Sequence, residues 1–167
     1  MRIQVVDKGD QLIGSKDRLE INHETDIYRV AALWLVNSKG EALIAQRKLT
    51  KNNEPGKWGP SVAGTVEEGE DYESNIYKEA QEEIGLTGVQ FSEVIKIYND
   101  GPRRYFTQWY IAKVDKDVSD FTPQPEEVEQ VAWKLYEELV DDVQRHPENY
   151  IPSMIKGVAV LAEGLKA

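Results

Sequence analysis

The segment from Tyr28 to Asn37, YRVAALWLVN, constrains the fold more than any other stretch because it is almost entirely apolar. A short continuous apolar run of this kind predicts a well-buried strand. The turn-like residues SKGE and the strand-like residues ALIAQRK follow it, so the two strands are expected to form a hairpin at the centre of a sheet. Three later segments are also strand-like: VQFSEVIKIYN, RYFTQWYIAKV and VEQVAWKL.

Helices are expected between and after these strands. Small or apolar residues recur every four positions from Tyr72 to Ile84, which predicts an amphipathic helix that ends at Gly85, a preferred C-terminal cap residue. A shorter helix is expected from about Leu139 to Val143, and residues 150–167 are predicted to form a helix that packs on the core. This order of elements favours the α/β class, with a mixed sheet covered by helices on both faces.

The length of 167 residues predicts a single domain, 1–167, with residues 1–27 as an N-terminal hairpin extension. The chain has no cysteine, which excludes disulfides, thiolate metal sites and a cysteine nucleophile. Its net charge of −10 disfavours binding to large nucleic acids or to anionic membranes. No segment reads as a signal or membrane-spanning sequence, so a cytoplasmic location is expected.

Acidic residues are concentrated between residues 64 and 86, before and within the predicted helix. On a helix, Glu79, Glu82 and Glu83 would lie on one side, away from the apolar stripe. Like charges this close repel each other by roughly a few tenths of a kcal/mol per pair, and a bound divalent cation would turn that repulsion into binding energy. Carboxylate oxygens suit Mg²⁺, with Mn²⁺ as an alternative. The simpler interpretation is a solvated acidic helix face.

Basic residues precede this acidic segment. Residues 47–57 hold four cations and a single acid, Glu54, in a stretch whose Asn, Pro and Gly content predicts a long surface loop. Cations beside a carboxylate metal site suit a phosphate-bearing substrate. The candidate substrate-binding residues are Arg47, Lys48, Lys57 and Trp58, although an aromatic residue near a strand is more often part of the core.

The acidic segment, GTVEEGEDYESNIYKEAQEEIGL, resembles the Nudix box. The fixed positions of the box are matched, at the required spacing, by Gly64, Glu70, Glu79, Ala80, Glu82, Glu83, Gly85 and Leu86. Only Lys78 departs from the pattern, which has Arg there. Since Arg makes fork-shaped hydrogen bonds and Lys is a point charge, we expect a looser loop before the helix. The sequence from about Tyr28 to Leu139 also resembles Nudix domains.

The resemblance implies an α/β/α sandwich with a mixed sheet. It also implies a Nudix pyrophosphohydrolase that uses Mg²⁺ to cleave a diphosphate bond in a nucleoside diphosphate linked to a group X. The implied metal ligands are Glu79, Glu82, Glu83 and the Gly64 carbonyl. Glu70, Glu79 and Glu82 are the candidate catalytic residues, and which of them is the general base stays open. The implied partner is a small nucleotide-derived substrate, and a homodimer is a further expectation.

Two alternatives have weaker support. The layout of the N-terminal half resembles isopentenyl diphosphate isomerases, but those enzymes need a Cys just before the box Gly and a His-rich metal site. This chain has neither, and Ser61 and Val62 stand in the segment before the box Gly. A Nudix-fold binding or regulatory module would have lost box carboxylates, and all are present. Beyond the box, a further metal ligand or base could come from Glu126, Glu127 or Glu129, although a solvated edge explains at least two of these.

Overall fold

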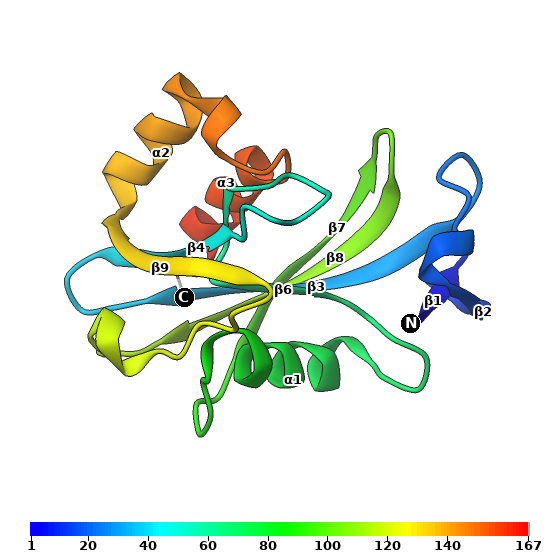
Figure 1. Cartoon of the computed structure of the whole chain (residues 1–167), viewed down its shortest axis with the longest axis horizontal. Coiled ribbons are helices and arrows are strands. Elements are labelled where there is room, and N and C mark those ends of the chain that lie inside the picture. Colours follow the sequence, from blue (N-terminus) through cyan, green and yellow to red (C-terminus); the bar gives the residue numbers. More distant parts are fainter. Residues whose placement is uncertain (167) are drawn as a thin grey trace.

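Strand β3 (Ile27–Val36) lies at the centre of a nine-stranded mixed sheet in the computed structural model, which describes residues 1–166 (Figure 1). It pairs in parallel with β8 (Arg104–Lys113) along its whole length. It pairs antiparallel with β6 (Val62–Thr65), from Val30 opposite Thr65 to Leu33 opposite Val62. The side chains of β3 in the middle of the sheet have no exposed surface, which confirms the buried central strand.

The predicted hairpin between β3 and the next strand, β4 (Glu41–Arg47), is only partly correct. The two strands share a single residue pair, Val36 with Ala42. They then separate, because β6 occupies this edge of β3 further along. β4 pairs instead with β9 (Val128–Leu135) and with the short β5 (Trp58–Gly59). The sheet is therefore split between β4 and β6.

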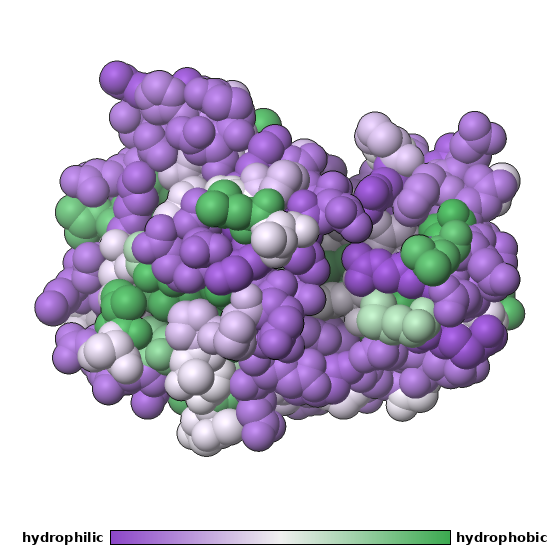
Figure 2. All heavy atoms as spheres, viewed as in Figure 1, coloured by the Kyte–Doolittle hydropathy of each residue, from purple (hydrophilic) through white to green (hydrophobic). Residues whose placement is uncertain are grey.

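Two further hairpins flank β3, the N-terminal one on the edge that also carries β6 and the other, which includes β8, on the opposite edge. β1 (Arg2–Val6) and β2 (Leu12–Asp17) form the predicted N-terminal hairpin, and β1 meets the beginning of β3 at Val6 and Ile27. β7 (Ser92–Asp100) pairs with β8, as the sequence predicts. The face of the molecule seen in Figure 2 is mostly hydrophilic, in keeping with a chain in which 30% of residues are charged.

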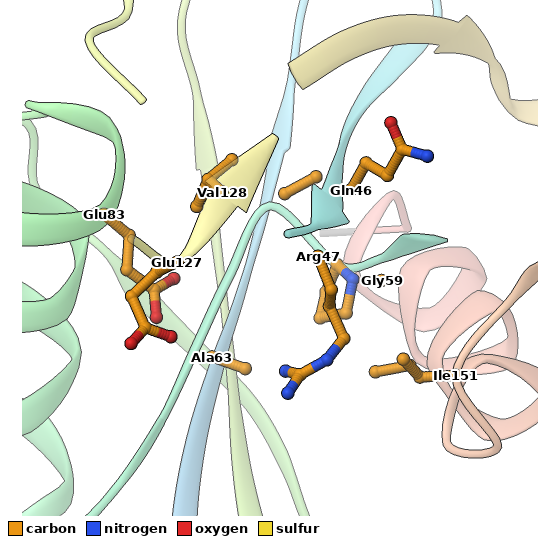
Figure 3. A pocket seen from close by; sticks show the side chains of 10 residues that line it. Gln46, Arg47, Gly59, Ala63, Glu83, Glu127, Val128 and Ile151 are labelled. Carbon is orange, nitrogen blue, oxygen red and sulfur yellow. The ribbon is translucent and has the colours of Figure 1, made fainter. Parts of the chain in front are cut away.

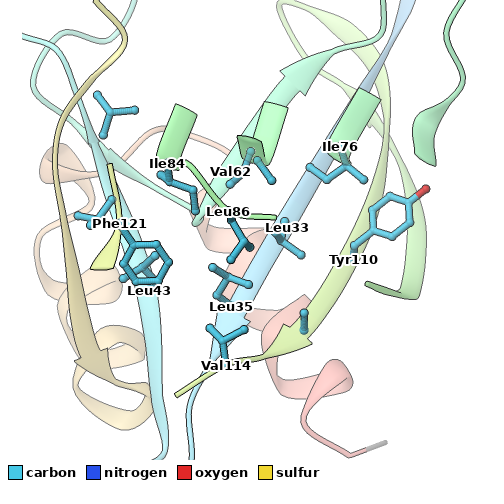
Figure 4. Close-up of a cluster of buried hydrophobic side chains, with 14 of the residues drawn as sticks. Leu33, Leu35, Leu43, Val62, Ile76, Ile84, Leu86, Tyr110, Val114 and Phe121 are labelled. Atoms are coloured by element: carbon cyan, nitrogen blue, oxygen red, sulfur yellow. The ribbon is translucent and has the colours of Figure 1, made fainter. Parts of the chain in front are cut away.

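Helices cover both faces of the sheet, which confirms the α/β/α sandwich (Figure 1). Helix α1 (Tyr72–Ile84) packs on one face over the cluster in Figure 4, which includes Leu33, Leu35 and Tyr110. Helices α2 (Tyr136–Arg145) and α3 (Met154–Gly164) cover the other face, around Trp34 and Trp109. Three short 3₁₀ helices complete the fold, at Arg18–Glu20, Val118–Asp120 and Pro147–Asn149.

Helix α1 has the boundaries that its sequence predicts. Asp71 accepts a hydrogen bond from the Ser74 amide at 2.7 Å, and the Ser74 hydroxyl accepts one from the Asp71 amide at 3.0 Å, which gives a capping box. Gly85 ends the helix in the left-handed region, with a φ of 70°. Ile76, Ala80 and Ile84 have no exposed surface. The amphipathic helix is confirmed.

The C-terminal helix packs on the core as predicted, over a shorter range. Met154 and Leu161 are fully buried, but Ile155 is 65% exposed and Leu165 is 45% exposed, so these two apolar residues contribute little to the packing. Gly157 and Gly164 provide the close approach instead, lying against Trp109 and Ile111. Residue 167 lies outside the described part of the chain. None of the helices within residues 1–166 combines the length and the apolar character needed to cross a membrane.

Candidate active site

The carboxylates of the box helix do not all face solvent, contrary to the expectation from their spacing. Glu79 lies against β6: a Cβ atom on Gly64 would overlap the Glu79 side chain, so glycine is needed for this contact. Glu83 is also partly buried and lies near Ala63, the neighbouring residue of β6. Only Glu82 is exposed. Two of the three carboxylates therefore lie against strand β6.

Burial makes both inward-facing carboxylates weaker acids. It raises the pKa of Glu79 to about 7, since the favourable charge of Lys78 is not enough to offset desolvation and the repulsion from Glu82. Burial, followed by the charge of Glu79, raises the pKa of Glu83 well above its ordinary value, and Glu127 adds to the repulsion. Neighbouring carboxylates with strongly raised pKa values are typical of functional sites.

Asn75 provides a further oxygen at this place. Its side chain has no exposed surface, and its Nδ2 atom donates to the Thr65 carbonyl at 3.0 Å and to Glu70 Oε2 at 2.8 Å. Its Oδ1 atom is buried without a hydrogen-bond partner in the described chain, and it lies 3.0 Å from where a Cβ of Gly64 would be.

The chemistry of these donors fits a hard divalent cation. They are carboxylate, amide and carbonyl oxygens, as Mg²⁺ and Mn²⁺ prefer. Within residues 1–166, however, no three acidic, His or Cys side chains are already close enough together to hold a metal ion. The predicted ligands Glu79, Glu82, Glu83 and Gly64 share the second half of α1 and the adjoining strand, and Glu82 is the exposed one of the three carboxylates.

A hollow opens where β4 and β6 separate, and Figure 3 shows its side chains. The side chain of Glu83, from α1, and that of Glu127, the residue just before β9, lie on one side of it. Arg47, at the end of β4, lies on the other side. We call it the central hollow. It is lined by Ala45, Gln46, Arg47, Gly59, Pro60, Ala63, Glu83, Glu127, Val128 and Ile151.

Glu127 is an acidic residue from outside the box that lines this hollow. Of the three acids considered there, Glu126 is exposed and Glu129 pairs with Lys48 at 3.1 Å. Glu127 instead lies beside Glu83 and pairs with Lys51 at 2.5 Å. The sequence offered three similar acids within four positions and gave no means of choosing among them.

The structure separates the four candidate substrate-binding residues. Arg47 lines the central hollow, and its Nε atom donates to the Asn53 carbonyl at 3.0 Å. Lys48 lies beside it in the ion pair with Glu129. Lys57, paired with Glu54 at 2.7 Å, and Trp58 line a neighbouring cleft, and Gln46 borders both openings. Trp58 also packs against the hydrophobic cluster under α2 and α3.

Lys78 joins the helix to the loop that precedes it. Its ammonium group contacts the carboxylates of Glu67 and Glu70, and lies 3.7 Å from Glu79. Lysine holds two partners here without the fork of an arginine, because an ammonium group has three donors that can point in different directions. The expected looser loop stays a prediction. The loop is bridged despite the absence of arginine.

Glu70 is fully engaged by its neighbours. One carboxylate oxygen contacts Lys78, and the other accepts from Asn75 and, at 3.1 Å, from the Glu67 amide. Although burial alone would raise the pKa of Glu70, the hydrogen bonds from Lys78 and Asn75 outweigh it and hold the pKa below its ordinary value. This geometry suits a residue that positions the loop better than one that accepts a proton.

Comparison with sequence families matches the NUDIX domain over residues 27–154, which is most of the chain. The chain belongs to the Nudix family. The resemblance based on the box is thereby confirmed, and Nudix hydrolases among its relatives support the expected enzyme class, a pyrophosphohydrolase. The N-terminal hairpin lies outside the matched residues.

Three similar proteins cover nearly the whole chain. A prenyl-diphosphate phosphatase of Methanosarcina mazei is 30% identical over 93% of this chain and 92% of its own length. An isopentenyl-diphosphate Delta-isomerase of Serratia proteamaculans is 26% identical over 87% of this chain and 83% of its own. The crystal structure of DR0079 from Deinococcus radiodurans is 23% identical and has a TM-score of 0.82, covering 95% of this chain and 98% of that one. This last similarity supports the fold.

Proposed function

We propose that this Nudix protein is an Mg²⁺-dependent hydrolase that cleaves the diphosphate bond of a nucleoside diphosphate linked to a second group. The observation that carries the proposal is the central hollow, where the acids Glu83 and Glu127 face Arg47. A diphosphate needs both kinds of group, since cations neutralise its charge and carboxylates hold the metal. Glu79 and Gly64 adjoin the hollow through β6.

The proposed metal ligands are Glu79, Glu82, Glu83 and the Gly64 carbonyl, with Glu127 as a further candidate from outside the box. Bound there, Mg²⁺ or Mn²⁺ would neutralise phosphate charge and make a water molecule more acidic. Arg47 offers a planar fork of donors that matches phosphate oxygens, which makes it the strongest substrate-binding candidate. Lys48 is adjacent, and Lys57 and Trp58 would contact the more distant part of a substrate.

Three carboxylates were considered for proton transfer, and their environments differ. Burial raises the pKa of Glu79 to about 7 in the metal-free protein, but a cation bound there would lower it, so this pKa does not select Glu79 as the general base. Glu82 is exposed and free to meet water. Glu70 has both oxygens engaged, so we propose that it holds the loop.

A prenyl diphosphate is the second candidate substrate. Two observations favour it: the relative from Methanosarcina mazei is a prenyl-diphosphate phosphatase, and Ala45, Val128 and Ile151 give the central hollow an apolar wall beside its charged groups. Such a wall could contact a hydrocarbon chain. The isomerase reaction is not proposed, because the chain has no cysteine. A cytoplasmic location and a homodimer stay predictions.

A substrate panel would test the proposal. Purified protein with Mg²⁺ would be given nucleotide sugars, ADP-ribose, dinucleotides, nucleoside di- and triphosphates and prenyl diphosphates, and phosphate or phosphomonoester release would be measured. Glu83→Gln is expected to reduce turnover by about 10²-fold or more, as is typical when a group acting on transition-state charge is removed. Glu73→Gln, an exposed acid on the same helix, is the matched control. Hydrolysis that survives Glu83→Gln would contradict the assigned site.

A further inference from the structure

We infer that the N-terminal hairpin, β1 and β2 with their turn, is part of the active site, and that Gln4 and Asp10 are positioning residues for it. They would hold the box loop, defined as residues 66–71, which joins β6 to α1 and carries Glu67 and Glu70. The inference rests on the proposed function for its catalytic consequence, while the contacts themselves do not depend on it. The hairpin lies before residue 27, where the family match begins.

Backbone hydrogen bonds pair the hairpin with the box loop. Strand β1 contacts β3 only at its end and continues past it. There the Gln4 amide donates to the Val66 carbonyl at 3.1 Å, and the Glu68 amide donates to the Arg2 carbonyl at 3.0 Å. Figure 1 shows this loop passing next to the N-terminus before it enters α1. The box loop is therefore held along one side by the hairpin.

The side chain of Gln4 also holds the loop, and it is only 4% exposed. Its Nε2 atom donates to the carbonyl of Glu70, and its Oε1 atom accepts from Arg29 at 2.9 Å. Both ends of the amide are thus used, one on the loop and one on the central strand. The same Glu70 contacts Lys78 and Asn75 through its carboxylate. Gln4 therefore fixes the backbone of a residue whose side chain is already tied to α1.

Asp10, in the turn of the hairpin, makes the remaining contacts. Its carboxylate is 8% exposed and accepts from Arg29 at 2.7 Å, from Lys96 at 2.6 Å and from the Tyr72 hydroxyl at 2.9 Å. Tyr72 is the first residue of α1. Asp10 has a φ of 60°, a left-handed conformation that its many partners stabilise. The hairpin turn is in this way attached to the start of the helix that carries Glu79.

Together these contacts fix both ends of the box loop. Gln4 and the β1 backbone hold the loop itself, and Asp10 holds the residue where α1 begins. From there, Glu79 is two turns along α1, and its side chain lies against Gly64 in β6, the strand that leads into the loop. Since small displacements of reacting groups reduce catalysis strongly, loss of these contacts should lower turnover more than substrate binding.

The experiment compares Gln4→Ala with Gln11→Ala, which removes an exposed glutamine from the same hairpin. Amide hydrogen exchange would be followed at Glu67, Glu68 and Glu70, whose amides are bonded in the structure. In Gln4→Ala we expect these amides to exchange at least about tenfold faster, with core amides unchanged, because the opening is local. We expect kcat to fall at least about tenfold with KM changed by less than about threefold. Gln11→Ala should match the wild type in both measurements.

Asp10→Asn provides a second, independent variant, because Asn also tolerates the left-handed conformation. It should give the same pattern of a lower kcat and nearly constant KM. Unchanged exchange in the box loop of both variants would overturn the inference. So would faster loop exchange with an unaltered kcat or, in Gln4→Ala, faster exchange throughout the molecule. If the wild type cleaves no compound in the panel, the proposed function fails, and the exchange data still decide whether the hairpin holds the loop.

Discussion

At the scale of single residues, the buried carboxylates of the site lower the stability of the folded protein when they are ionised. Gly64 has no side chain, which allows Glu79 to lie against β6 in a partly buried place where ionisation is unfavourable. Lys78 compensates only in part, since its ammonium group is engaged mainly by Glu67 and Glu70. Without a cation the carboxylates of Glu79 and Glu83 repel each other. The site is therefore expected to be a local source of instability in the metal-free protein at neutral pH and above.

Replacing Glu79 with Gln should stabilise the metal-free protein at alkaline pH. A carboxyl whose folded pKa is raised binds more protons when folded, so its penalty is absent below the unfolded value of 4.5 and grows as pH rises to about 7. At pH 8 the free energy of unfolding in EDTA should be about 1–3 kcal/mol higher in Glu79→Gln than in the wild type. Urea unfolding at several pH values would measure this.

The difference for Glu79→Gln should disappear as the pH falls toward 4.5, where the wild-type carboxyl is protonated in both states. Mg²⁺ should stabilise the wild type and not the variant. A stability difference that is independent of pH would contradict the predicted electrostatic cause. Glu73→Gln, on the exposed face of the same helix, is the control.

At the scale of elements, the box helix is defined by local signals at both ends. The capping box of Asp71 and Ser74 begins it, and Gly85 ends it with its amide bonded to the Gln81 carbonyl at 3.0 Å. The last carbonyls are also used by a distant segment, since Thr122 and Gln124 donate to the carbonyls of Ile84 and Glu83. The chain leading to Glu127 is thereby attached to the same helix end as Glu83.

Replacing Asp71 with Ala should destabilise the protein by about 1 kcal/mol, the usual contribution of a side-chain N-cap. The Ser74 amide would lose its acceptor, so the first turn of α1 would open more readily. Chemical denaturation at pH 7 would measure the change. Asp141→Ala is the matched control, because its exposed ion pair with Arg145 should contribute little. Equal effects of the two substitutions would argue against a capping role for Asp71.

At the scale of the whole molecule, the sheet and the hairpin decide where the site lies. The split between β4 and β6 opens the central hollow, and the β1–β2 hairpin holds the box loop. Asp10 links three separate parts of the chain, because Arg29, Tyr72 and Lys96 all donate to its carboxylate. One buried acid therefore connects the hairpin, the central strand, the box helix and β7.

Asp10 should contribute to acid sensitivity. Burial alone would raise the pKa of Asp10, but hydrogen bonds from Lys96, Arg29 and Tyr72 outweigh it and hold the pKa below its ordinary value. A lowered folded pKa gives stability that is present above the unfolded value of 3.8 and is lost as pH falls through the folded value. Asp10→Asn should cost about 1–3 kcal/mol at pH 7, and less as the pH falls below 3.8.

Thermal or urea unfolding between pH 3 and pH 7 would check the role of Asp10. Glu24→Gln, an exposed acid in the segment after the hairpin, is expected to follow the wild-type curve. A constant difference between Asp10→Asn and the wild type over this range would contradict the linkage to the Asp10 charge. Convergence of the two curves at low pH would support it.

The sequence by itself determined the features that depend on neighbouring residues. Helix α1 has a local cap at each end and an apolar residue every fourth position, and β3 is a continuous apolar run, so both were predicted without knowledge of the fold. The box pattern identified the family for the same reason, since its spacing is set along one helix and its loop. The separation of β3 and β4 was missed because it depends on β6, a strand of only four residues that was not predicted.

Only the tertiary structure decided which polar and charged groups meet. Gln4 and Glu70 are 66 positions apart, and Lys51 and Glu127 are 76 apart, so no local pattern marks either contact. The burial of Glu79 and Glu83 but not Glu82 likewise follows from the position of β6 against α1. Side-chain types and their spacing are written in the sequence, whereas their exposure, pKa and partners depend on long-range packing, and it is these that give the carboxylates of α1 their different roles.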